Sequence, residues 1–124
     1  MVAAIAAALI LAASTGQFDL DCAGMETVQG PDGAQTSRPY AKTWVIDLDA
    51  GTFCGRGCHA AGAIAHVDPA EIVLSDELGV LSDHLAVNRT TGELHGRSTS
   101  PGRITDVSAA CKLSPFTGLP ARAF

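Results

Sequence analysis

The sequence predicts a mainly β protein: an antiparallel meander or small, partly closed β-barrel of roughly six to seven short strands after a cleaved N-terminal signal segment. Three observations predict this fold. Apolar and polar residues alternate over several short segments, and clusters of Gly, Pro, Asn and Asp separate those segments at hairpin spacing. In addition, no long stretch shows the 3.6-residue period of an amphipathic helix.

The chain begins with sixteen uncharged residues, almost all apolar or small. A helix needs about 20 residues to cross about 30 Å of hydrocarbon, so this run is short for a span and typical of a secretory signal. Ser14 and Gly16 supply the small residues of a cleavage site. We therefore predict a signal peptide over residues 1–16 and a single disulfide-linked β domain over residues 17–124, periplasmic or secreted. Cleavage after Ser14, an uncleaved anchor and a core segment remain as alternatives.

The first half of the domain contains two clear strands. Residues 18–22 alternate, residues 29–39 have the composition of a loop, and residues 44–49 alternate again. A turn over residues 49–51 follows, in which Asp49 can bond to its own backbone and Gly51 can take a positive φ. The residues expected to point inward are Phe18, Leu20, Cys22, Trp44, Ile46 and Leu48.

The second half contains a strand, a hairpin and a final strand. The pattern of residues 59–67 indicates neither a helix nor a strand. Residues 71–75 predict a strand with Ile72 and Leu74 inward. Residues 85–98 predict a hairpin that turns at residues 89–92, with Gly92 left-handed. Residues 104–111 predict the last strand. We expect residues 112–120 to leave the sheet, because prolines lack the donor, and Phe116 to plug one end.

Four cysteines in an exported chain predict two disulfides, which could pair in three ways. Cys54 and Cys58 enclose Gly-Arg-Gly, whose glycines let the chain curl enough to join them. Cys22 ends the first predicted strand and Cys111 ends the last. Their bond would join the two ends of an antiparallel meander that closes on itself. We therefore predict the pairs Cys22–Cys111 and Cys54–Cys58.

The order of these motifs resembles that of small uncharacterised exported proteins of α-proteobacteria with four cysteines. The resemblance covers nearly the whole domain and implies no activity for any residue. The motifs that carry it are the apolar export signal, Phe-Asp-Leu-Asp-Cys, Trp-Val-Ile-Asp-Leu-Asp, Cys-Gly-Arg-Gly-Cys, Asn-Arg-Thr-Thr-Gly, Ala-Ala-Cys and Pro-Phe-Thr-Gly-Leu-Pro.

An alternative to the local disulfide is a haem or metal site formed by Cys54, Cys58 and His59. The pattern C-x3-C-H is one residue longer than the C-x2-C-H that attaches c-type haem. His59 would then be an axial ligand, and the candidates for the second ligand are Met25, His66 and His84.

Two further metal sites can be considered. His84 and His95 lie on opposite arms of the predicted hairpin and could face each other, but alternation places them on the face away from the core, so we expect surface histidines rather than zinc ligands. The stretch from Asp47 to Gly51 imitates the start of a calcium loop. Cys58 stands where the bidentate Glu of such a loop belongs, so we expect only a turn.

The remaining chemistry favours binding over catalysis. The chain has thirteen acidic and eight basic residues, a formal net charge of −5, and no basic cluster with interleaved aromatics, so nucleic acid is not an expected partner. Ser98 lacks the second glycine of a nucleophile elbow, because the glycine at position 96 is matched by a serine at position 100. We therefore expect a monomeric, non-catalytic module without a cofactor that binds a protein, an envelope component or a small apolar ligand. A small envelope hydrolase is the further alternative.

Overall fold

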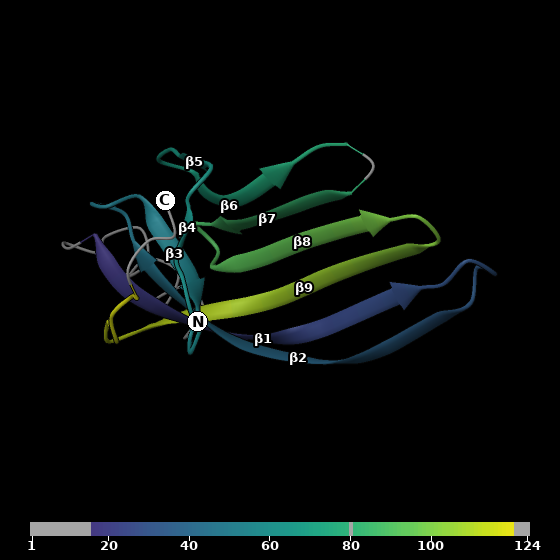
Figure 1. Cartoon of the computed structure of the whole chain (residues 1–124). Coiled ribbons are helices and arrows are strands. Elements are labelled where there is room, and N and C mark those ends of the chain that lie inside the picture. Colours follow the sequence, from purple (N-terminus) through teal and green to yellow (C-terminus); the bar gives the residue numbers. More distant parts are fainter. Residues whose placement is uncertain (1–15, 80, 121–124) are drawn as a thin grey trace.

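The computed structural model describes residues 16–79 and 81–120, which form one nine-stranded antiparallel sheet (Figure 1). The strand order is β4-β3-β2-β1-β9-β8-β7-β6-β5. The predicted signal peptide lies outside the described residues, apart from Gly16. The strands are β1 (Gln17–Gln29), β2 (Gln35–Asp47), β3 (Thr52–Gly55), β4 (Gly62–Ala63), β5 (His66–Val67), β6 (Glu71–Glu77), β7 (Ser82–Asn88), β8 (Glu93–Ser100) and β9 (Arg103–Ser114).

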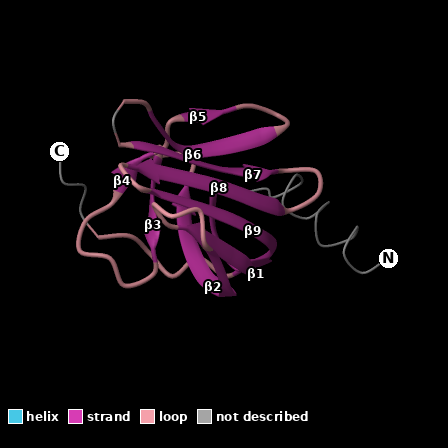
Figure 2. Cartoon of the chain, turned by 90° about the vertical axis from the view of Figure 1, so that its right-hand side faces the viewer, coloured by secondary structure: helices cyan, strands magenta, loops and turns pink. Residues whose placement is uncertain are grey.

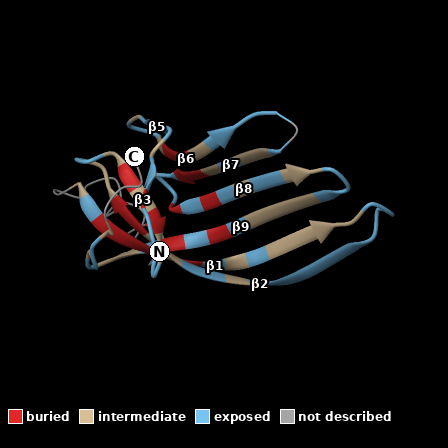
Figure 3. Cartoon of the chain, viewed as in Figure 1, coloured by how far each residue is buried: buried red, intermediate tan, exposed pale blue. Residues whose placement is uncertain are grey.

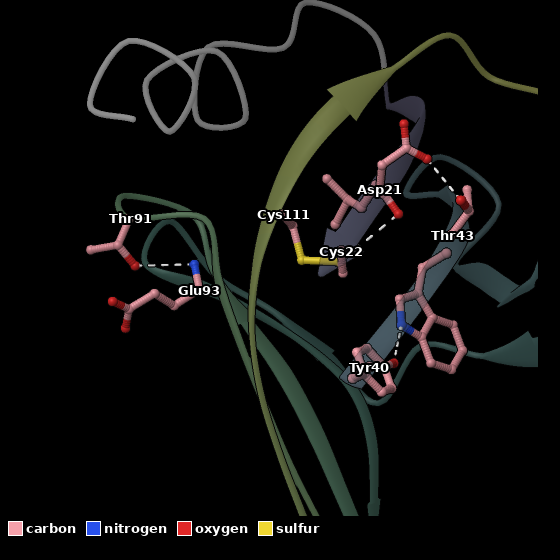
Figure 4. The surroundings of a disulfide bond; sticks show 9 residues. Asp21, Cys22, Tyr40, Thr43, Thr91, Glu93 and Cys111 are labelled. Atoms are coloured by element: carbon pink, nitrogen blue, oxygen red, sulfur yellow. Dashed lines mark hydrogen bonds between the residues drawn. A yellow bond between two sulfur atoms is a disulfide. The ribbon is translucent and has the colours of Figure 1, made fainter. Parts of the chain in front are cut away.

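The first and last strands of the described chain, β1 and β9, pair at the centre of the sheet. Their register runs from Asp19 opposite Ser114 to Gln29 opposite Ile104 and places Cys22 directly opposite Cys111. A disulfide joins these two cysteines, whose Cα atoms are 4.0 Å apart. Figure 4 shows this bond bridging the two neighbouring strands. The predicted pairing of the chain ends is therefore present.

The meander is open between β4 and β5, which form the two edges of the sheet. Only residues 64 and 65 connect these edges. Their backbone amides donate hydrogen bonds to segments on the two sides of the opening. Ile64 N donates to Gly51 O at 2.9 Å, and Ala65 N donates to Val73 O at 3.0 Å. The sheet therefore curls into an open half-barrel whose edges approach each other at one end, and the strands follow an arc in Figure 2. We call this end the closed end and the opposite end, where the β1–β2 and β8–β9 turns lie, the open end.

The hydrophobic core fills the concave face at the closed end. Figure 3 shows buried residues concentrated there and intermediate or exposed residues toward the open end. Alternation explains this core, because successive side chains of each strand point to opposite faces. The predicted inward residues Ile72 and Leu74 are both buried. The other buried members are Phe18, Leu20, Cys22, Ile46, Val87, Leu94, Ala109 and Cys111.

A buried carboxylate on the outer face holds three distant segments together at the closed end. Asp19 has no exposed surface, and its Oδ2 accepts hydrogen bonds from Arg56 Nη2 at 2.9 Å and Thr117 Oγ1 at 2.7 Å. Thr117 N donates to Oδ1 at 3.2 Å. Arg56 belongs to the loop closed by the Cys54–Cys58 disulfide, and Thr117 belongs to the C-terminal segment. A buried carboxylate requires such partners, since an unpaired one is strongly penalised.

The strand count differs from the prediction because three short strands carry weak sequence signals. β3 has four residues, and β4 and β5 have two each, too few for a period to be read. The two-residue strands lie within residues 59–67, whose sequence pattern indicated neither a helix nor a strand. The mainly β, antiparallel and partly closed fold was predicted correctly, whereas the number of strands was too low.

The loop expected over residues 29–39 is mostly strand. Only residues 30–34 form the turn, and β2 begins at Gln35 with Pro39 in its interior. Thr43 O accepts the amide of Arg56 in the neighbouring loop, so the odd-numbered residues of β2 direct their backbone groups away from β1. Pro39 is one of these residues, and it lies where β2 has no neighbour on that side. Its missing N–H therefore interrupts no hydrogen bond between strands. Sheets tolerate proline at such unpaired positions.

The C-terminal expectation was wrong in part. Residues 112–114 continue β9, and the segment leaves the sheet only from Pro115. Phe116 is half-buried and stands outside the core cluster, so it does not plug the sheet. The segment is held at the closed end through the contact of Thr117 with Asp19 instead.

We predict that the two disulfides contribute unequally to stability. In the chain-entropy model a loop of about ninety residues contributes about 4.6 kcal/mol and one of about five residues about 2 kcal/mol. Replacing Cys22 and Cys111 together with Ser should therefore lower Tm more than the same change at Cys54 and Cys58, measured by circular dichroism. A larger effect of the Cys54/Cys58 pair would contradict this order. Non-reducing peptide mapping checks the pairing, and a Cys22–Cys54 link would overturn it.

We predict a second stability effect at the β7–β8 turn. Gly92 has φ 77°, as expected, and its amide donates to Asn88 O at 2.8 Å. Gly92→Val should reduce the free energy of unfolding by about 1–2 kcal/mol, because a β-branched side chain is strained at positive φ. Thr90→Ala is the control, since Thr90 joins the turn through its backbone amide. Similar losses for both variants in a denaturant titration would refute the role of Gly92.

Candidate functional site

The concave face is hollow toward the open end, where the core side chains give way to a groove of about 200 Å³. Strands β1, β2, β7, β8 and β9 all contribute to it, so it is formed by segments that are distant in the sequence. The residues that line it are Glu26, Tyr40, Lys42, Trp44, Asp83, His84, Leu85, Gly96, Arg97, Ser98, Thr105 and Val107.

Aromatic side chains of β2 form one wall of this concave groove. Trp44 Nε1 donates a hydrogen bond to the Tyr40 hydroxyl at 3.2 Å. Figure 4 shows Tyr40 on β2 beside the central disulfide. The Trp44 ring packs against Phe53 of β3, with centroids 5.8 Å apart. These contacts fix the indole at the boundary between the filled core and the groove, and Leu85 and Val107 supply apolar surface there.

Two carboxylates add charge to the groove. Glu26 of β1 forms an ion pair with Arg38, and its side chain is only 19% exposed. Asp83 of β7 accepts hydrogen bonds on both oxygens, from Ser75 Oγ at 2.7 Å and from Ser98 Oγ at 2.8 Å. Both oxygens of the Asp83 carboxylate are therefore held by neighbouring hydroxyl groups.

Electrostatics also affect the tyrosine. Burial raises the pKa of Tyr40 above its ordinary value, the negative charge of Glu26 raises it further, and the hydrogen bond from Trp44 opposes both effects. The Tyr40 hydroxyl therefore stays protonated across the physiological range. It offers a polar contact beside the Trp44 ring.

A larger hollow of about 560 Å³ lies near the closed end. Its walls come from the C-terminal segment, including Phe116 and Leu119, and from β2, β3 and the turn between them. Its lining contains a single ionisable side chain, Asp47. The Asp47 carboxylate accepts hydrogen bonds from Ala50 N and from Gln17 Nε2. The hollow therefore offers little recognition chemistry compared with the concave groove.

The cysteine cluster does not assemble as a metal or haem site in the structure. Cys54 and Cys58 are joined to each other, so neither thiol is available for a thioether or a metal, and His59 is exposed. Met25 and His84 lie on the outer face far along the sheet from the cysteine loop, and His66 pairs with Asp68 at 3.4 Å. Within the described ranges, no group of three or more His, Cys, Asp or Glu side chains could hold a metal ion.

The remaining candidate metal ligands lie on the outer face and in the β2–β3 turn. His84 and His95 do share the outer face, and each contacts a carboxylate, Asp76 at 3.2 Å and Glu93 at 3.4 Å. The calcium-like stretch is the β2–β3 turn. There Asp47, rather than the expected Asp49, accepts a hydrogen bond from Ala50 N at 2.9 Å.

Ser98 has no catalytic partner of the expected kind. It donates directly to Asp83, and across residues 16–79 and 81–120 no hydrogen bond joins a serine to a histidine. A nucleophilic serine requires such a base within reach. The contact instead orients the Asp83 carboxylate in the groove.

No protein-family model and no curated protein matches the chain. Among the described residues, no helix is long and apolar enough to cross a membrane. The candidate site is therefore assigned from its geometry.

Sequence reasoning identified Trp44 as an inward residue but missed the groove itself. Tyr40 lies at an inward position of β2 and Glu26 at one of β1, and both belong to stretches for which no element was predicted. The signal that could have found them is the alternation from Trp44 back through Lys42 to Tyr40, which continues the same face of the strand.

We predict that Tyr40 titrates above the ordinary tyrosine value of about 10. Tyr40 is the only tyrosine of the chain, so tyrosinate absorbance at 295 nm reports it alone. Because the folded pKa is raised, the associated stability is fully present below the unfolded pKa and is lost as pH rises through the folded pKa. Tyr40→Phe should reduce the alkaline loss of stability. A folded midpoint equal to that in denaturant would contradict burial of the hydroxyl.

Proposed function

We propose that this protein is an exported, non-catalytic binding module that holds a small, largely apolar ligand in the concave groove. The observation that carries the proposal is that the half-barrel is filled by side chains at its closed end and hollow at its open end. Small-ligand sites are concave, mostly apolar and equipped with a few polar groups, and they occur at the mouths of β-barrels. In the groove, Trp44, Leu85 and Val107 supply apolar surface, Tyr40 supplies a hydroxyl, and β1 and β7 supply two carboxylates.

Two disulfides support the exported part of the proposal, because they are compatible with an oxidising, extracellular environment. They also keep the site in shape. The Cys22–Cys111 bond crosslinks β1 and β9, and both strands contribute side chains to the groove. A site held by crosslinked strands is preorganised, which lowers the entropic cost of binding.

The test uses Trp44, the only tryptophan of the chain, as a fluorescence donor. The probe is N-phenyl-1-naphthylamine, which is neutral, apolar and fluorescent in apolar surroundings. We expect saturable binding with energy transfer from Trp44. A probe that fails to bind, or binds without energy transfer, would refute an apolar groove site.

A matched pair of variants locates the probe. Thr105 lines the groove from β9, whereas Ser108 on the same strand is exposed on the outer face. Thr105→Phe fills part of the groove and should weaken binding by about tenfold, equivalent to about 1.4 kcal/mol. Ser108→Phe adds the same ring outside the groove and should leave affinity unchanged. Equal effects would place the probe elsewhere, and circular dichroism checks that both variants fold.

A further inference from the structure

The groove already holds an ammonium group on an aromatic ring. Lys42 Nζ lies 4.3 Å from the centroid of the Trp44 ring, within the range of a cation–π contact. Gly55 of β3 leaves room for this side chain, because a Cβ at Gly55 would lie 2.6 Å from Lys42 Cε. The ion pairs of the described residues do not include Lys42. The ring, rather than a carboxylate, therefore holds the ammonium in place.

Charged groups of both signs line the groove. Glu26 and Asp83 supply two carboxylates, and Arg97 is occupied on the outer face by Asp106, at 2.7 Å from its Nε. The partner of Glu26, Arg38, does not line the groove and is 70% exposed. Lys42 and Asp83 are therefore the lining charges without an ion pair among the described residues, and Asp83 is the carboxylate that no cation occupies. The chain as a whole carries a formal charge of −5, which also attracts cations.

We propose that the groove recognises an organic ammonium ion with an apolar body, whose charged group displaces Lys42 from the face of Trp44. The ammonium would contact the indole ring and lie between the carboxylates of Glu26 and Asp83. The apolar body would pack on Leu85 and Val107. This inference rests on the proposed function and names the ligand class of the same site. Lys42 is exposed at the groove, so it can move into solvent without burying its charge.

An amphipathic anion is the opposite case, and Lys42 separates the two. For an ammonium ligand Lys42 is a competitor, and removing its charge vacates the ring and lowers the local positive potential. For an anionic ligand Lys42 is the counter-ion, and removing it abolishes the attraction. The variant Lys42→Met keeps the length of the side chain and removes the charge, so the sign of its effect identifies the ligand class.

The experiment compares benzyltrimethylammonium with phenylmethanesulfonate, which share a benzyl group and differ in charge. Binding is measured by Trp44 fluorescence and calorimetry at low ionic strength, since screening weakens both interactions. We expect the ammonium to bind about tenfold more tightly than the sulfonate, and Lys42→Met to strengthen ammonium binding by about threefold or more. Preference for the sulfonate, or weaker ammonium binding to Lys42→Met, would overturn the inference.

Asp83→Asn tests the carboxylate with its shape retained. It should weaken ammonium binding by about fivefold and leave the neutral naphthylamine probe unchanged. Glu93→Gln removes a carboxylate from the outer face, where its side chain contacts His95, and serves as the control, with no expected effect on either probe. If the neutral probe responds to Thr105→Phe but the ammonium shows no preference, the proposed function stands and the cation inference fails. If neither probe binds, both fail.

Discussion

The pairing of β1 with β9 is the constraint on which the rest of the structure depends. These strands stand at the two ends of the described sheet-forming chain, yet they lie at the centre of the sheet, and every other strand is added outward from them. A pairing between segments so distant in the sequence has a large entropic cost of loop closure. The Cys22–Cys111 bond offsets part of that cost, because it restricts the unfolded chain most when it closes a long loop.

The geometry of the central pair explains why these cysteines can be joined. In an antiparallel ladder, directly opposed residues alternate between hydrogen-bonded pairs and closer, non-hydrogen-bonded pairs. Cys22 and Cys111, with Cα atoms 4.0 Å apart, occupy a close pair on the concave face. Two residues further along, Gly24 opposes Ala109, and a Cβ at Gly24 would overlap the Ser108 carbonyl oxygen. The two strands therefore approach closely at the point where the filled core ends.

The two ends of the half-barrel are stabilised by different physical means. At the closed end both faces are covered, since the core fills the concave face and the contacts of Asp19 hold the cysteine loop and the C-terminal segment on the outer face. At the open end the strands of the hairpins continue beyond the core, and polar and aromatic side chains replace aliphatic ones. This division leaves a groove whose walls are anchored in a rigid core, the arrangement expected of a binding site.

The sequence by itself determined the local features of this protein. Period-2 alternation placed Leu20, Ile46 and Ile72 inward, because a strand directs successive side chains to opposite faces. Gly92 was identified as the left-handed turn residue because few other residues tolerate that conformation. The disulfide pairs followed from loop length and from the positions of the cysteines at strand ends.

Only the tertiary structure decided which distant residues meet. Tyr40, Glu26 and Asp83 form one groove because three strands place them on the same concave face, and no local pattern encodes that contact. Pro39 lies inside a strand because the neighbouring position is empty, and Asp19 is buried because Arg56 and Thr117 reach it from remote segments. Propensity and period describe a residue's own strand, whereas burial and recognition depend on neighbours supplied by the rest of the chain.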